Sequence, residues 1–144
     1  MARTLRTMQE DVSFVPTDKP PLRVYLVEDS ELVRERLEEM LSSIAGALSV
    51  GKASGVSEAI QGILASHPDA VVLDVRLADG NGFEVLRAVH EQAPDIAFYV
   101  LSNFSSEPYR RLAEQLGATQ FFDKTTEFER MREVLSARAA RTLN

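Results

Sequence analysis

Apolar residues follow two different spacings along this chain from Leu22 onward. Short runs that are rich in β-branched and aromatic residues predict strands. Between these runs, apolar residues recur at helical spacing, which predicts amphipathic helices. The predicted strands cover residues 22–28, 47–54, 70–75, 96–102 and 119–123. The run at 47–54 alternates apolar and polar positions, as a half-exposed edge strand does.

Each predicted strand is followed by a predicted helix. The apolar positions that mark these helices include Leu37, Ile63, Leu86, Leu112 and Leu135. The helix expected from about 106 to 116 should stop at Gly117, because glycine readily ends a helix. The segment LADGNG at 77–82 has the composition of a turn and is predicted to be a loop.

Five strand–helix units in this order predict one α/β domain. Such alternation favours a parallel sheet with helices on both faces. The chain is too short for a closed eightfold barrel. We therefore expect a flavodoxin-like, doubly wound (βα)5 sheet with strand order 2-1-3-4-5. Residues 1–21 lack clear periodicity and are interrupted by prolines, so they are expected to form a flexible arm before a folded domain at 22–144.

Composition excludes several classes of function. The chain of 144 residues has no cysteine, which rules out disulfides and thiol catalysis. The formal net charge of −6 argues against binding to nucleic acid, which requires a basic surface. No apolar run approaches the roughly 20 residues of a membrane span, and the N-terminus lacks the apolar segment of a secretory signal. A cytoplasmic protein is expected.

Polar side chains occur where the predicted strands end. Glu28 and Asp29 end the first strand, Asp74 lies in the third, Ser102 ends the fourth, and Lys124 follows the fifth. Doubly wound sheets bind ligands beyond the carboxyl ends of their strands, where the strand order reverses. Carboxylates are hard oxygen ligands that suit Mg²⁺, and a lysine supplies a point charge for a phosphoryl group. Three clustered carboxylates without a cation would repel one another.

Four stretches carry a resemblance to a known family. They are VEDS (27–30), LDVRLADGNG (73–82), VLSN (100–103) and GATQFFDK (117–124). In this order and spacing they resemble the receiver domain of two-component response regulators, over Leu22 to about Arg138. The resemblance implies a stand-alone receiver, because no DNA-binding or catalytic module follows.

The resemblance implies a metal site and a phosphoacceptor. Asp74 is similar to the aspartate that accepts the phosphoryl group. Asp29 is similar to a direct Mg²⁺ ligand and Glu28 to one that acts through water. The backbone carbonyl of Arg76 would complete the metal site.

The remaining roles concern the phosphoryl group itself. Ser102 would bind a phosphoryl oxygen, and Lys124 would pair first with Asp74 and then with the phosphate. The donor implied by the family is a phosphohistidine of a sensor histidine kinase or of a histidine phosphotransfer protein. The aspartyl phosphate is later hydrolysed, so the protein would catalyse only its own phosphorylation and dephosphorylation.

Four residues depart from the usual family pattern. Ala78 replaces a proline, which predicts a less rigid loop. Asn103 stands where a smaller residue is common, and Phe121 stands at the aromatic switch position that is often tyrosine. Thr125 replaces the proline after Lys124, so the Lys124–Thr125 peptide bond is expected to be trans. Phe121 and Phe122 are adjacent on a strand and should point to opposite faces of the sheet.

Two pairs of residues have simpler interpretations. His67 and His90 lack metal-ligating neighbours and are expected to be structural. Arg110 and Arg111, on the helix at 106–116, form either a solvated face or part of a contact surface. In the family, that surface binds partner proteins or a second copy to form a homodimer.

Several functions remain open at this point. A receiver of this kind either controls a downstream protein target or carries phosphate in a phosphorelay. An alternative class is a Mg²⁺-dependent phosphohydrolase with an aspartyl-phosphate intermediate, although no second acid/base carboxylate or cap is evident. A third is a degenerate receiver that works without phosphorylation. A flavin-binding protein is disfavoured because no phosphate-binding loop follows the first strand.

Overall fold

The computed structural model describes residues 20–143 of the chain, with side chains up to Arg141. The arm predicted at 1–21 lies outside the described residues except for its last two prolines. The parallel strands are β2 (Leu22–Val27), β3 (Ala47–Ala53), β4 (Ala70–Leu73), β7 (Ala97–Ser102) and β8 (Gln120–Asp123). The helices are α2 (Glu31–Ser42), α3 (Val56–Ser66), α4 (Gly82–Gln92), α5 (Glu107–Gln115) and α6 (Phe128–Leu143).

The five strands form one parallel sheet in the order β3-β2-β4-β7-β8. Numbered as they occur among the parallel strands, this order is 2-1-3-4-5, which confirms the flavodoxin-like topology predicted from the sequence. The order reverses at the neighbouring strands β2 and β4, so the residues that follow these two strands lie side by side.

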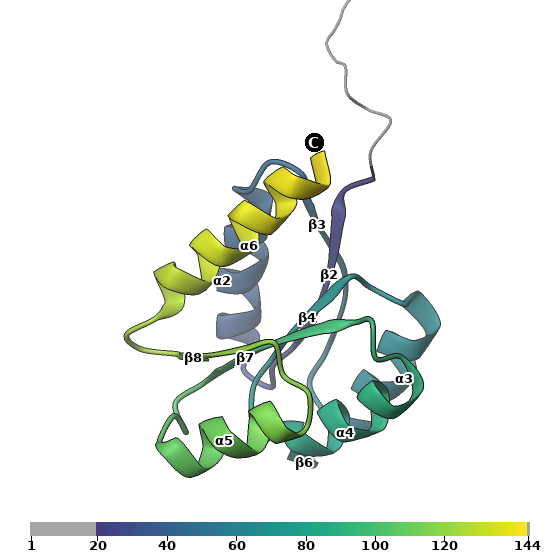
Figure 1. Cartoon of the computed structure of the whole chain (residues 1–144), viewed down its shortest axis with the longest axis vertical. Helices are drawn as coiled ribbons and strands as arrows, with labels where there is room; N and C mark the ends of the chain where they lie inside the picture. The colour runs from purple at the N-terminus through teal and green to yellow at the C-terminus, as the bar shows by residue number, and fades with distance from the viewer. Residues whose placement is uncertain (1–19, 144) are drawn as a thin grey trace, which may run out of the picture.

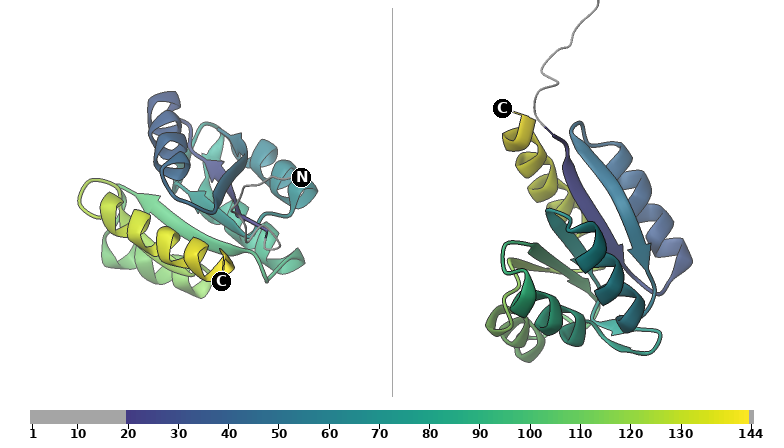
Figure 2. Two further views of the ribbon diagram at one scale, coloured as in Figure 1. Left: turned by 90° about the horizontal axis from the view of Figure 1, so that it is seen from above. Right: turned by 90° about the vertical axis from the view of Figure 1, so that its right-hand side faces the viewer.

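Helices cover both faces of the sheet (Figures 1 and 2). α2 and α6 pack on one face, against alternate residues such as Leu26, Val72 and Phe122. α3 and α4 pack on the other face, with α5 beside them against Val100 and Phe121. The two adjacent phenylalanines therefore point to opposite faces, as predicted. The start of β2 and the end of α6 lie at the same end of the molecule.

The segment predicted as the loop LADGNG contains a short antiparallel hairpin. Its strands are β5 (Arg76–Leu77) and β6 (Gly80–Asn81). The preceding strand ends at Leu73 rather than at residue 75, because the Asp74 side chain accepts a hydrogen bond from the next backbone N–H. Strand pairing in so short a segment depends on the turn and leaves almost no periodic signal.

Hydrogen bonds hold this hairpin where the family usually has a proline. The Ala78 N–H donates to the carbonyl of Ser54 at 3.1 Å. The Asp79 carboxylate accepts from the Val56 N–H at 2.6 Å, which caps the first turn of α3. These contacts tie the hairpin to the segment that begins α3, and the lower rigidity expected at Ala78 stays a prediction.

Two further expectations can be compared with the structure. The Lys124–Thr125 peptide bond is trans, as predicted. Among the described residues, no helix is both long enough and apolar enough to cross a bilayer. The cytoplasmic location stays a prediction.

Candidate functional site

The ends of β2 and β4 bring the predicted carboxylates together. The Asp74 N–H donates to the carbonyl of Val27 at 3.0 Å, and the Glu28 N–H donates to the carbonyl of Ala53 at 3.0 Å. These bonds hold both residues next to the sheet although they lie just beyond its regular strands. Glu28 is 2% exposed and Asp74 is 7% exposed, whereas Asp29 is exposed to solvent.

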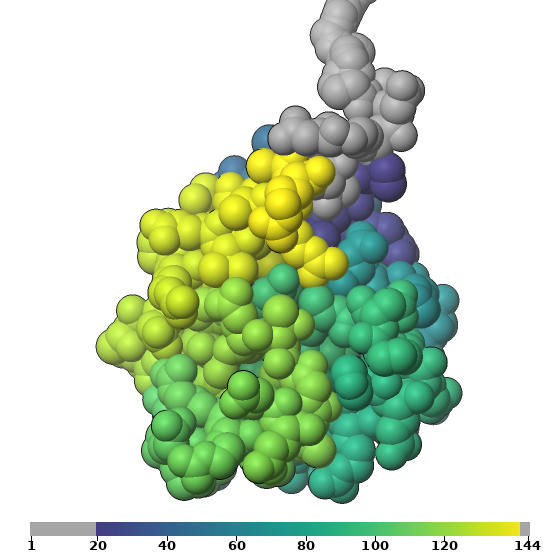
Figure 3. All heavy atoms as spheres, in the orientation of Figure 1, coloured from purple at the N-terminus to yellow at the C-terminus, as the bar shows by residue number. Residues whose placement is uncertain are grey.

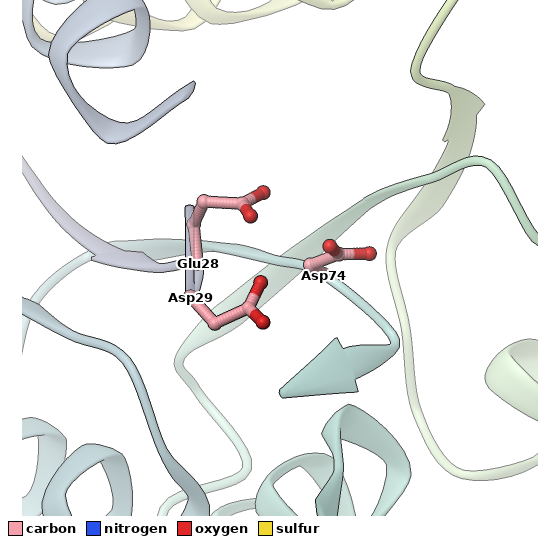
Figure 4. Close-up of side chains that lie close together, drawn as sticks. All are labelled: Glu28, Asp29 and Asp74. Carbon is pink, nitrogen blue, oxygen red and sulfur yellow. The ribbon is translucent and has the colours of Figure 1, made fainter. Parts of the chain in front are cut away.

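The three carboxylates face a common region (Figure 4). One oxygen from each of Glu28, Asp29 and Asp74 lies within 4.8 Å of the others. Hard oxygen donors at this separation suit Mg²⁺, which binds few carboxylates and keeps several waters or phosphate oxygens. The donor set therefore fits a Mg²⁺ ion with positions left for a phosphoryl group.

Lys124 joins two of the carboxylates. Its Nζ donates to Glu28 Oε1 at 2.9 Å and to Asp74 Oδ2 at 2.8 Å. Each carboxylate also accepts a backbone hydrogen bond. The Val75 N–H donates to Asp74 Oδ1 at 2.7 Å, and the Ser30 N–H donates to Glu28 Oε2 at 3.0 Å. The site is thus built around one cation that two acidic side chains share.

Burial and charge act in opposite directions on this cluster. Burial raises the pKa of Glu28, although the hydrogen bonds from Lys124 and from the Ser30 N–H oppose the shift. Burial lowers the pKa of Lys124, but hydrogen bonds to Asp74 and Glu28 outweigh it, so the pKa of Lys124 is raised overall. Lys124 pairs with two of the three clustered carboxylates, which leaves an excess of negative charge that a divalent cation would compensate.

A pocket surrounds these groups. Asn103, Phe104 and Arg76 line it together with the carboxylates and Lys124. Ser102 is fully buried at the end of β7, and its Oγ accepts a hydrogen bond from the Phe104 N–H at 3.1 Å. The exposed Asn103 accepts a hydrogen bond from the Thr125 hydroxyl at 3.0 Å. The hydroxyl and amide expected beside a phosphoryl group therefore flank the acidic cluster.

Ser102 does not line the acidic pocket, and neither does Phe121. Phe121 is half-buried on β8 and lines a separate groove with Arg110 and Ala113. The two predicted structural histidines also lie apart from the acidic pocket. His67 Nε2 lies 3.1 Å from Asp95 Oδ2, and His90 packs against Gly117.

Sequence reasoning missed two arginines near this end of the sheet. Arg34 Nη1 donates to the carbonyl of Glu28 at 2.6 Å. Its position one helical turn after Ser30 was the available signal. Arg76 was predicted only as a carbonyl ligand, but its guanidinium also lies over the ring of Phe104 at 5.0 Å. That contact joins β5 to the loop between β7 and α5, which is far away in the sequence, so residue spacing does not predict it.

The chain is similar to known signalling proteins. Residues 24–136 match the family model described as the response regulator receiver domain. The DNA-binding transcriptional activator DevR/DosR of Mycobacterium tuberculosis is 36% identical over 123 residues, which cover 85% of this chain and 57% of the relative. A protein-glutamate methylesterase/protein-glutamine glutaminase of Geobacter sulfurreducens is 33% identical over 73% of this chain and 28% of its own length.

Solved structures give the same result for the fold. The non-phosphorylated HemR receiver domain of Leptospira biflexa is 31% identical, with a TM-score of 0.72 over 84% of this chain and 94% of that one. The two curated relatives are longer: this chain spans about half of the first and less of the second.

Proposed function

The chain belongs to the family of response regulator receiver domains, and on that premise we propose that it is a Mg²⁺-dependent phosphoacceptor switch. The single observation that carries the proposal is the cluster of Glu28, Asp29 and Asp74 around the amine of Lys124. A merely structural cluster would not need the third, exposed carboxylate of Asp29.

Each residue of the cluster receives a role. Asp29, Asp74 and the carbonyl of Arg76 would hold Mg²⁺, and Glu28 would act on it through water. The ion supplies charge neutralisation for the incoming phosphoryl group. Lys124 is already bound to Asp74 Oδ2, so it can follow the charge from the carboxylate to the phosphoryl oxygens.

The reaction exchanges one phosphorus bond for another. A carboxylate oxygen of Asp74 attacks phosphorus in line, and the bond from phosphorus to the donor histidine nitrogen breaks. The Ser102 hydroxyl donates to a phosphoryl oxygen once the group has arrived. Water later attacks the phosphorus, which returns Asp74 to a carboxylate and releases inorganic phosphate. The chemistry of this segment is limited to these two steps on its own side chain.

We propose two kinds of partner. The phosphodonor is a sensor histidine kinase or a histidine phosphotransfer protein. Output passes through contact with another protein surface, either a downstream target or the next carrier of a phosphorelay. The two relatives described above couple a receiver to DNA binding and to methylesterase activity. In this proposal, the segment at 22–144 acts through protein contacts rather than by binding nucleic acid itself.

Small phosphodonors test the metal site directly. Asp29→Ala should abolish Mg²⁺-dependent labelling by acetyl phosphate, because the exposed metal ligand is lost. Asp95→Ala is the matched control: it also removes an exposed carboxylate, but one that precedes β7 at the opposite end of the sheet. Equal labelling of wild type and Asp29→Ala would contradict the assigned site.

A further inference from the structure

Arg110 is held in place by four contacts. Its Nε donates to the carbonyl of Ser105 at 2.7 Å, and Nη1 donates to the carbonyl of Phe121 at 3.3 Å. Nη2 forms an ion pair with Glu127 Oε1 at 3.0 Å. The guanidinium also lies over the Phe121 ring, 5.0 Å from its centre. Arg110 therefore connects several parts of the chain, whereas the sequence left open whether it belongs to a solvated face or to a contact surface.

These contacts join two loops at the same end of the sheet as the acidic cluster. Ser105 lies in the loop between β7 and α5, whereas Glu127 lies in the loop between β8 and α6. In the space-filling view, the green atoms of α5 lie below the yellow-green atoms of the segment from β8 to the start of α6 (Figure 3). Glu127 Oε1 also accepts from the Asp123 N–H at 2.7 Å, so the same carboxylate anchors the second loop.

Two further hydrogen bonds connect the same two parts of the chain as the Arg110 contacts do. The Ser105 hydroxyl donates to Asp123 Oδ2, and the Thr125 hydroxyl donates to Asn103 Oδ1. The first loop is thus tied to the second at Asn103, at Ser105 and, through Arg110, at the carbonyl of Ser105.

We propose that Arg110, with Ser105 and Glu127, forms a latch that stabilises the unphosphorylated conformation and weakens when Asp74 is phosphorylated. The inference rests on the proposed phosphoacceptor function. The latched loop begins at Ser102, the hydroxyl that would turn toward the phosphoryl group. When Ser102 and Asn103 shift toward Asp74, Ser105 is drawn away from Arg110 and Asp123.

The latch takes the place of a tyrosine-based switch. Phe121 has no hydroxyl that could form a hydrogen bond with the loop between β7 and α5. Arg110 instead binds the backbone of Phe121 and covers its ring, so release of the guanidinium exposes the Phe121 face of β8 beside α5. A planar guanidinium can make these contacts simultaneously, which a lysine ammonium cannot.

The test is the affinity for beryllofluoride, a stable mimic of the phosphoryl group, in the presence of Mg²⁺. A latch that favours the resting state reduces the population competent to bind the mimic. Arg110→Gln should therefore lower the dissociation constant for beryllofluoride by about fivefold. Its amide exchange at 103–106 and 123–127 should rise without the mimic. Arg111→Gln is the matched control, because Arg111 is exposed and its side chain makes no ion pair among the described residues.

The outcomes separate the latch from the site on which it rests. Glu127→Gln keeps an acceptor for the Asp123 N–H but loses the ion pair, and it should shift the affinity in the same direction. It also serves if Arg110→Gln does not fold. Unchanged or weaker beryllofluoride binding by these variants would overturn the latch while leaving the phosphoacceptor site intact. Failure of the wild type to bind beryllofluoride with Mg²⁺ would overturn both.

Discussion

At the residue scale, Lys124 offsets the repulsion between the buried carboxylates of Glu28 and Asp74. Its amine lies within 3 Å of Glu28 and of Asp74, and both of those side chains are buried. Its location beside the carboxylates was predictable because it directly follows a strand, and the ends of parallel strands converge at one edge of the sheet. The finer division of its hydrogen bonds between two acids was not predictable, since it depends on rotamers that sequence spacing does not determine.

Lys124→Met should destabilise the folded protein by about 2 kcal/mol without Mg²⁺, because two buried carboxylates lose their shared cation. Mg²⁺ should restore more stability to this variant than it adds to wild type, since it replaces the missing positive charge. Urea denaturation with and without Mg²⁺ measures both effects. Lys52→Met, which removes an exposed pair with Glu38, is the control and should change little. A Lys124 variant as stable as wild type without Mg²⁺ would argue against a shared cation.

The hydrogen bond from Ser105 to Asp123 predicts that the stability of the fold depends on pH. The Ser105 hydroxyl is the main cause of a lowered pKa of Asp123, which falls to about 2. The unfolded carboxyl titrates near pH 4. Because the folded pKa is the lower one, this carboxylate stabilises the fold above about pH 4 and loses its contribution as pH falls toward about 2.

Ser105→Ala should therefore be less stable than wild type near neutral pH, and the difference should narrow between about pH 4 and about pH 2. Acid titration of urea stability gives the comparison. Ser106→Ala is the matched control, because the Ser106 side chain makes no capping hydrogen bond. A Ser105→Ala difference that stays constant through this window would show that the hydrogen bond does not set the pKa of Asp123.

At the element scale, the start of α4 is fitted closely against the end of β4. A Cβ added at Gly82 would collide with the backbone carbonyl of Asp74. The Gly82 N–H also donates to the carbonyl of Val75 at 2.6 Å. Turn composition predicted a break here, but it did not predict that one glycine allows the helix to approach the backbone of Asp74.

Gly82→Ala should cost about 3 kcal/mol of stability and slow phosphorylation, because the backbone of Asp74 must shift to relieve the overlap. Gly80→Ala is the control in the same hairpin. Its Cβ would meet only the ends of the Val56 and Glu84 side chains, at 2.9 and 3.0 Å, which can move. Thermal unfolding measures the stability of both variants, and labelling by acetyl phosphate measures how fast each is phosphorylated. Equal behaviour of the two would mean that the approach of α4 to Asp74 is unimportant.

At the scale of the whole molecule, the periodic pattern predicted the fold class and strand order. Residues such as Leu26, Val72 and Phe122 are buried on one face because strand side chains alternate. The same pattern did not predict contacts between loops. Arg110 meets Phe121 and Glu127 only after β8 and α6 have packed, and nothing in its local sequence distinguishes it from the exposed Arg111. The convergence of polar side chains at the strand ends was therefore predictable, and the contacts that connect the neighbouring loops were not.

Asp74 is proposed to accept a phosphoryl group with the help of Mg²⁺. The direct measurement is the intact mass of the protein after incubation with acetyl phosphate, followed by peptide mapping of the modified residue. We expect one added phosphoryl group per chain, located on Asp74, that is absent in excess chelator and in Asp74→Asn. Labelling that persists in Asp74→Asn, or that is indifferent to chelator, would contradict the account.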